Sequence, residues 1–165
     1  MSTHVKIASV SVGSGGSASM AFSSIPATFS DLILYVSARN TYAGVADDIL
    51  MSFNGGASRT SRYLYGTGAA VASVSVGANI GLITSNTATA SVFASCKIQI
   101  TQYAGSNYKS INAMSVSENG AALAYQVIAS GIWSNTAAIT SISLTPNSGS
   151  FMEFSSADLY GIKNS

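Results

Sequence analysis

Apolar and polar side chains alternate along most of this chain, the pattern of a strand with one face on a core and the other in water. The segments DLILYVSAR (residues 31–39) and SVFASCKIQITQY (residues 91–103) show it most clearly. Their predicted inward positions are Leu32, Leu34, Val36, Ala38, Val92, Ala94, Cys96, Ile98 and Ile100. No window of helical length combines a 3.6-residue apolar period with caps. The pattern therefore predicts antiparallel sheets.

Turn signals divide the chain into roughly ten strands. The pairs Asn54-Gly55 and Asn119-Gly120 favour tight hairpin turns, because both positions tolerate positive φ. Residues 67–90 predict a long, small-residue loop region with short strands. The other predicted strands are 4–12, 18–23, 48–54, 62–66, 108–118, 123–133, 138–145 and 151–162. This organisation predicts an all-β fold over residues 1–165, a single antiparallel β-sandwich domain of the jelly-roll type.

The segment AYQVIASGIW (residues 124–133) is apolar on both faces of its predicted strand. One face carries Tyr125, Val127 and Trp133, and the other carries Ile128 and Ile132. Strands of this kind are covered on both sides. The second cover is either a loop of the same sandwich or a neighbouring subunit, and the sequence leaves both open.

The low proportion of charged residues bears on which partners the surface can bind. Only 8% of the residues are charged, 47% are hydrophobic and the formal net charge is +1, whereas about 25% is typical of soluble domains. A surface with so little charge repels other copies only weakly, which favours a protein whose surface is largely occupied by partners. The other interpretation of the low charge is an ordinary β protein rich in small residues. The seven Lys and Arg are spread from Lys6 to Lys163, and no apolar run reaches the ~20 residues of a membrane span. Neither a nucleic acid nor a membrane is an expected partner.

Few side chains could carry out a reaction. His4 is the only histidine and Cys96 the only cysteine, so the two supply at most half of a zinc site and no intramolecular disulfide. The predicted strand directs Cys96 inward, as a buried small side chain. The adjacent Asp47 and Asp48 point to opposite faces of a strand, although a loop there could bind calcium. We predict no enzyme activity, no catalytic or metal site and no cofactor.

Five motifs, in a fixed order, resemble a family of small virion proteins of tailed bacteriophages. They are FSSIPATFSDLILYVSAR (22–39), MSFNGG (51–56), YKSINAMSVSENGAA (108–122), IWSNTAAITSISL (132–144) and SADLYGI (156–162). They span most of the chain, but residues 67–90 match no motif. The resemblance implies a capsid decoration (cement) protein, or a tail-associated β-sandwich module, that commonly trimerises.

On this resemblance, we expect a non-enzymatic protein that decorates and stabilises the capsid as a homo-oligomer, most simply a trimer. Its partners would be other copies of itself and the major capsid protein. It would be made in the host cytoplasm and located on the outer capsid surface of the virion. Tyr125, Val127 and Trp133 are the candidate oligomer interface. Residues 1–12 would form an N-terminal strand or arm that contacts the capsid through Val5, Ile7, Val10 and Val12.

The alternative function is a tail or fibre module that binds a host-surface glycan. Arg59 and Arg62 lie close in sequence to Tyr63 and Tyr65, and they combine hydrogen-bond donors with aromatic rings near a turn. A lectin-like module outside any virion is a third possibility, and only the same tyrosines favour it.

Overall fold

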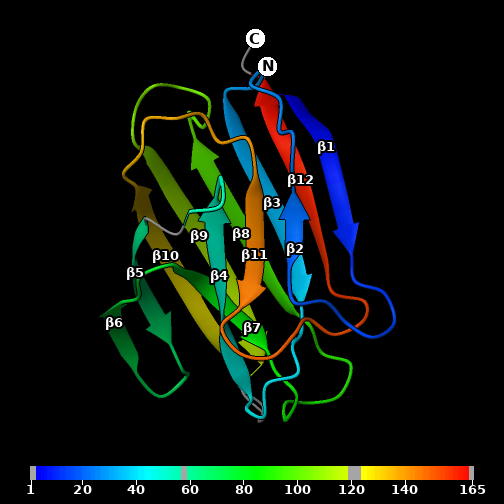
Figure 1. Ribbon diagram of the computed structural model, residues 1–165. Coiled ribbons are helices and arrows are strands. Elements are labelled where there is room, and N and C mark those ends of the chain that lie inside the picture. The colour runs from blue at the N-terminus through cyan, green and yellow to red at the C-terminus, as the bar shows by residue number, and fades with distance from the viewer. Residues whose placement is uncertain (1–2, 57–58, 119–123, 164–165) are drawn as a thin grey trace.

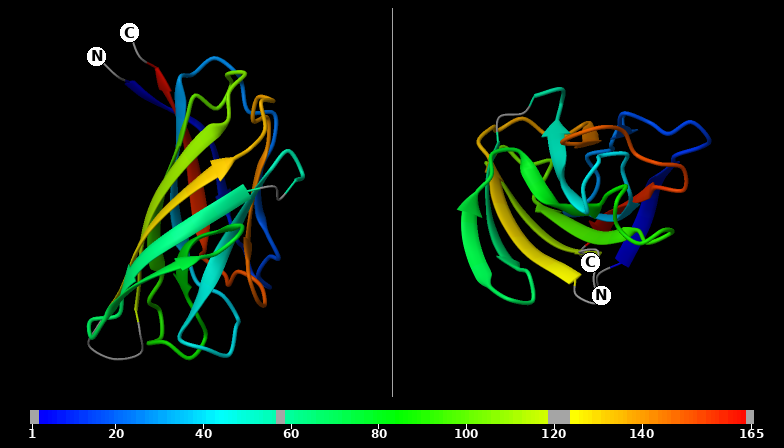
Figure 2. Two further views of the ribbon diagram at one scale, coloured as in Figure 1. Left: turned by 90° about the vertical axis from the view of Figure 1, so that its left-hand side faces the viewer. Right: turned by 90° about the horizontal axis from the view of Figure 1, so that it is seen from below.

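Strands packed in two layers account for the alternating pattern (Figures 1 and 2). The structure is a computed structural model that describes residues 3–56, 59–118 and 124–163. Within these residues, twelve strands form two antiparallel sheets, and no helix is present. The protein is therefore an all-β sandwich of the jelly-roll type, as the sequence predicts.

The two sheets differ in width. The larger contains eight strands, in the order β1 (Thr3–Ser11), β12 (Ser156–Lys163), β3 (Asp31–Ala38), β8 (Ala94–Thr101), β9 (Lys109–Glu118), β10 (Ala124–Trp133), β5 (Arg59–Gly66) and β6 (Val71–Ser75). The smaller contains four, in the order β2 (Met20–Phe22), β11 (Ile142–Pro146), β4 (Ala46–Phe53) and β7 (Asn79–Thr84). Figure 2 shows the wide sheet curving around the narrow one.

The core lies between the sheets and uses the predicted inward positions. The inward residues of β3, from Leu32 to Ala38, are at most 4% exposed, and those of β8 from Ala94 to Ile100 are at most 3% exposed. The rings of Phe53 and Trp133 join the two layers, with 5.3 Å between their centroids. Burial raises the pKa of the Cys96 thiol to about 12, so the thiol stays protonated, as expected of a structural cysteine.

Residues 67–90 contribute more to the fold than the predicted loop region. They contain β6 and also β7, in which Ile80 and Ile83 are fully buried. A Cβ on Gly81 would lie 2.9 Å from the Ser115 hydroxyl of β9, so the two sheets approach closely here. The backbone N–H of Leu82 donates to this hydroxyl at 3.0 Å. Close packing of small residues, which carry little hydrophobic signal, explains why the sequence pattern underestimated this segment.

The N-terminal segment is an edge strand of the wide sheet, so of the two predicted forms, a strand or an arm, the structure has the strand. β1 pairs with β12, and a bulge between Lys6 and Ala8 shifts its register. Because of this shift, Val5 and Val10 stand opposite Gly161 and Ala157 on the same face of the sheet, although an odd spacing would place them on opposite faces of a regular strand. Of the four predicted capsid contacts, Val12 is buried, Ile7 and Val10 are half-buried against the core, and Val5 is 39% exposed. These side chains mainly attach β1 to its own sandwich.

The motifs that carry the family resemblance meet in space. Asn54 follows β4 in a tight turn in which Asn54 (φ 50°) and Gly55 (φ 75°) both have positive φ, as predicted. β5 then crosses to the other sheet, so the turn does not join two paired strands. The Asn54 amide donates to the carbonyl of Ala138 at 2.8 Å and accepts from the N–H groups of Thr140 (2.9 Å) and Ser141 (3.1 Å). The predicted Asn119-Gly120 turn lies outside the described residues.

We expect Asn54→Gly to lower the free energy of unfolding by about 1–2 kcal/mol, because glycine keeps the positive φ but loses the side-chain hydrogen bonds. Thermal denaturation measures the change. Ser24→Gly is the matched control, since Ser24 is exposed and also has positive φ (54°). Equal stability of the two variants would show that the Asn54 bonds contribute nothing.

Candidate functional site on the outer face of the wide sheet

An uncovered apolar group lies on the outer face of the wide sheet, the face turned away from the narrow sheet. It consists of Leu64 on β5, Ile128 on β10, and Met114 and Val116 on β9. These four side chains, here called the apolar cluster, are 48–55% exposed. Ile128 stands directly opposite both Leu64 and Met114 in the sheet register. Side chains opposite each other on one face are in contact distance, so the cluster is continuous across three strands.

The apolar cluster resolves one alternative left open by the sequence. Ile128 and Ile132 of β10 are each 48% exposed, so no described loop buries this second apolar face. Their neighbours Val127 and Trp133 point the other way and are 1% and 2% exposed in the core. The loop alternative is therefore not met among the described residues, and the outer face of β10 is open.

The predicted oligomer interface requires a correction. Val127 and Trp133 fill the core of a single copy, because alternation along β10 directs them between the sheets. Tyr125 is half-buried on the same side of the strand. The sequence identified a strand apolar on both faces, but the candidate interface residues lie on the face that packs in the core.

The outer face becomes aromatic and charged toward β1. In this half, the Lys97 ammonium lies 5.9 Å from the centroid of the Tyr35 ring, and the rings of Tyr35 and Tyr160 meet edge to face at 5.8 Å. Lys6 forms a 3.0 Å ion pair with Asp158. A hydrogen bond from Ser9, together with Lys6, holds the pKa of Asp158 below its ordinary value. The face therefore has an apolar half over β5, β9 and β10 and a polar half over the strands on its other side.

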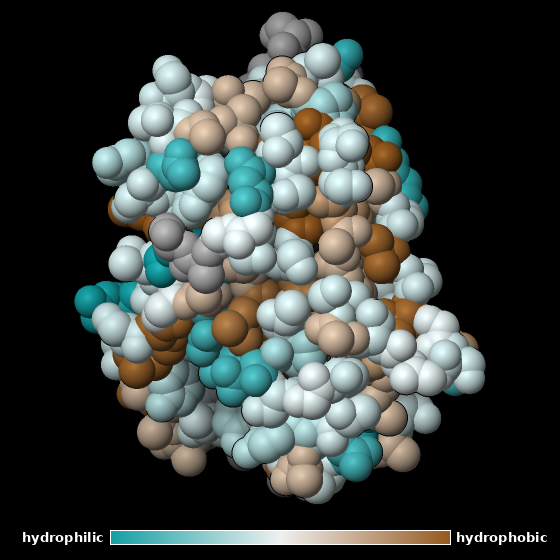
Figure 3. All heavy atoms as spheres, in the orientation of Figure 1, coloured by the Kyte–Doolittle hydropathy of each residue, from teal (hydrophilic) through white to brown (hydrophobic). Residues whose placement is uncertain are grey.

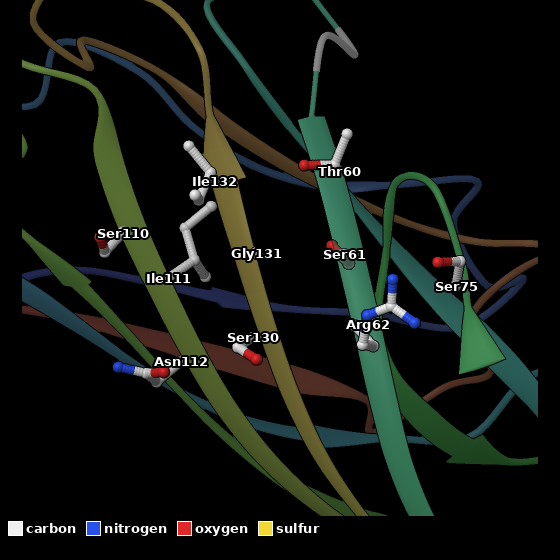
Figure 4. Close-up of a pocket in the computed structure, with 10 residues that line it drawn as sticks. All are labelled: Thr60, Ser61, Arg62, Ser75, Ser110, Ile111, Asn112, Ser130, Gly131 and Ile132. Atoms are coloured by element: carbon white, nitrogen blue, oxygen red, sulfur yellow. The ribbon is translucent and has the colours of Figure 1, made fainter. Parts of the chain in front are cut away.

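A depression of about 530 Å³ lies beside the apolar cluster (Figure 4). Ser110 and Asn112 line it from β9, Ser130 from β10, and Thr60 and Arg62 from β5. The short Ser110 and Ser130 side chains leave room between longer neighbours. The depression offers hydrogen-bond donors and one guanidinium, and no aromatic ring lines it among the described residues.

The four predicted glycan contacts separate in the structure. Arg62 lines the depression, whereas Tyr63 is buried and its hydroxyl donates to the carbonyl of Gly81 at 3.0 Å. Tyr65 is half-buried on the inner face of β5. Arg59 is 6% exposed, and its guanidinium has no hydrogen-bond acceptor among the described residues. Arg59 and Tyr63 therefore cannot contact a ligand on the surface, because alternation along β5 turns them inward.

The titratable groups of the described chain are dispersed. No three of its His, Cys, Asp and Glu side chains gather where they could hold a metal ion. Asp47 is buried, and its carboxylate accepts from the Asn40 amide and from the N–H of Ser148, both at 2.8 Å. These bonds attach the 147–150 loop to β4. The described residues also contain no helix long and apolar enough to cross a membrane.

Most of the apolar cluster went unrecognised in the sequence, because alternation does not say which face of a strand is inward. In residues 109–118, alternation places Lys109, Ser115 and Ser117 inward and Met114 and Val116 outward. Polar side chains on the inner face and apolar side chains on the outer face reverse the usual arrangement. The strand thus presents Met114 and Val116 to solvent and packs Ser115 and Ser117 in the interior.

These features define the class of protein: a β-sandwich with an uncovered apolar surface on its wide sheet. No protein family model matches the chain, and no curated protein matches it. Among solved structures, it is similar to the Caenorhabditis elegans galectin LEC-6, with 10% sequence identity, a TM-score of 0.33, and coverage of 94% of this chain and 96% of that one.

Proposed function

We propose that this chain is a non-enzymatic structural protein of a tailed bacteriophage that decorates and stabilises the capsid surface as an oligomer. Two things support the proposal. One is the ordered set of motifs resembling small virion proteins. The other is the apolar cluster, with Leu64, Met114 and Ile128 each about half exposed on a face that no described loop covers. The uncovered cluster is the observation that carries it.

The proposed mechanism is thermodynamic. A protein that binds the assembled shell and not its free subunits stabilises the shell by mass action. The outer face of the wide sheet is broad, and burial of the apolar cluster against the major capsid protein would drive binding. The two sides of this contact would repel each other little, since the chain carries a formal net charge of only +1.

Ile128→Asp and Met114→Asp test the contact. Each places a charge in the centre of the apolar cluster, and we expect binding to expanded, undecorated capsids to weaken about tenfold or more. Co-sedimentation measures binding, and the melting temperature of the shell reports stabilisation. Ala21→Asp is the control, because Ala21 lies exposed on the outer side of the narrow sheet.

The outcomes separate the candidates. Decoration would be supported if the native protein co-sediments stoichiometrically with capsids and raises the shell melting temperature. Only Ile128→Asp and Met114→Asp should lose these effects. Absence of the protein from capsids, with its recovery in tails of disrupted virions, would contradict it.

The depression favours a second candidate, a tail or fibre module that binds a glycan. Arg62, Asn112 and Ser130 surround about 530 Å³ with donors suited to sugar hydroxyls. Binding of the isolated protein to a glycan array, abolished by Arg62→Ala and retained by Ile128→Asp, would favour this function over decoration.

A further inference from the structure

β6 ends the wide sheet with an open edge. It pairs only with β5, and all five of its residues, VASVS, are exposed, with Val71 at 73% and Val74 at 41%. Figure 2 shows β6 outermost in the layer, and apolar side chains gather at this edge in Figure 3. Alternate residues of such a strand direct N–H and C=O groups to the open side, where another strand can pair with them.

The opposite edge of the same sheet is protected. β1 carries the charged Lys6, which is paired with Asp158, and a bulge between Lys6 and Ala8 interrupts its register. Charges and bulges are the features that prevent edge-to-edge association. β6 has no charged residue, no proline and no register shift against β5. The contrast within one sheet indicates an edge adapted for pairing.

The side chains of β6 suit a strand identical to itself. If Ser73 lies opposite the partner's Ser73, an antiparallel pair places Ala72 opposite the partner's Val74 and Val71 opposite the partner's Ser75. Each larger side chain then meets a smaller one. Ala72 and Val74 share the inner face with Tyr65 and Tyr63, their neighbours across β5, so the pairing would extend an existing apolar strip.

Charge does not oppose this arrangement. The nearest basic group, Arg62, stands opposite Ser75 on the outer face of β5. Three interstrand spacings, about 14 Å, would separate β5 from its counterpart, which is beyond the screening length at physiological salt.

We propose that β6 pairs antiparallel with β6 of a second copy about a two-fold axis at Ser73, which joins the two wide sheets into one. A two-fold contact closes on itself, so it gives a dimer and not the trimer implied by the family resemblance. Because the axis is perpendicular to the sheet, both outer faces lie on the same side. The pairing does not require that the chain decorate a capsid, but it would present two apolar clusters to one surface and so strengthen binding through avidity.

A charge exchange at Ser73 tests the pairing. Ser73→Lys and Ser73→Glu each place like charges opposite one another at the axis, and we expect each to weaken self-association on the order of 100-fold. An equimolar mixture of the two should regain the dimer, because the charges then attract. Sedimentation velocity over a concentration series measures the mass against that of the 16.8 kDa chain. Ser11→Lys, on the exposed end of β1, is the control and should leave the dimer unchanged.

Disulfide trapping gives a second measurement. Cys96 is buried and is the only native cysteine, so mild oxidation should crosslink Ser73→Cys into covalent dimers and leave Ser11→Cys without a crosslink on a denaturing gel. A native protein that is monomeric at every concentration would overturn the proposal. So would a trimer, or a dimer that is insensitive to charge at Ser73 and is not crosslinked there.

Discussion

Replacement of Arg39 by Met is expected to lower the free energy of unfolding by about 3 kcal/mol, because charge-assisted hydrogen bonds contribute more than neutral ones. Arg39 is 5% exposed at the end of β3. Its two terminal nitrogens donate to four backbone carbonyls: Thr89 at 2.7 Å, Val92 at 2.9 Å, Ala88 at 3.0 Å and Asn86 at 3.3 Å. One side chain thus holds the loop between β7 and β8.

The planar guanidinium is essential to this arrangement. Lysine presents its donors from a single nitrogen and cannot reach four carbonyls spread along a loop. Arg39→Lys should therefore recover little of the lost stability. The loss in either variant begins in residues 86–92, so the amides there should exchange with solvent faster before global unfolding.

Thermal and denaturant unfolding measure the change, which corresponds to a decrease in Tm of about 10 °C for a chain of this length. Arg62→Met is the control, because Arg62 is exposed on the outer face, and its effect should stay within about 0.5 kcal/mol. A full recovery of stability in Arg39→Lys would contradict the proposed role of the guanidinium geometry.

Gly161→Ala is expected to lower the free energy of unfolding by about 2 kcal/mol through steric overlap. A Cβ at this position of β12 would lie 2.2 Å from Cγ of Phe29. The backbone around Phe29 is constrained, because the buried Tyr103 hydroxyl donates to the carbonyl of Pro26 and accepts from the N–H of Phe29. The Phe29 ring would have to leave its place against the core.

A double-mutant cycle isolates this contact. In a Phe29→Ala background, Gly161→Ala should cost almost nothing, since the ring that it meets is gone. Gly66→Ala in β5 is the control, because its Cβ would meet no atom within 4 Å. An equal cost of Gly161→Ala with and without the Phe29 ring would contradict the overlap as its cause.

The contact between Phe29 and Gly161 and the hydrogen bonds of Asn54 explain why short motifs stand out in the sequence. Phe29 and Gly161 belong to the motifs at 22–39 and 156–162, and Asn54 connects 51–56 to 132–144. The motifs thus lie where segments that are distant in the sequence contact each other in the sandwich. They specify the fold of the sandwich.

The strands, the sandwich, the inward Cys96 and the positive-φ turn at Asn54-Gly55 could all be predicted from the sequence. Each depends on neighbours in the chain: alternation of period two, or the φ preference of one residue. Alternation separates the two faces of a strand but does not say which face meets the other sheet. Val127 and Ile128 are equally apolar, and only the packing of β7 against β9 and β10 places Val127 in the core and Ile128 on the surface.

The same limit applies to Arg39 and to the edges of the wide sheet. Arg39 reads as an ordinary outward position, and it is buried only because a loop some fifty residues away closes over it. β6 lies in the predicted loop region with short strands, and it is an open edge because the wide sheet extends past the narrow one. Strand order and sheet width arise from long-range pairing, so tertiary structure alone decided which surfaces of this protein remain free to bind.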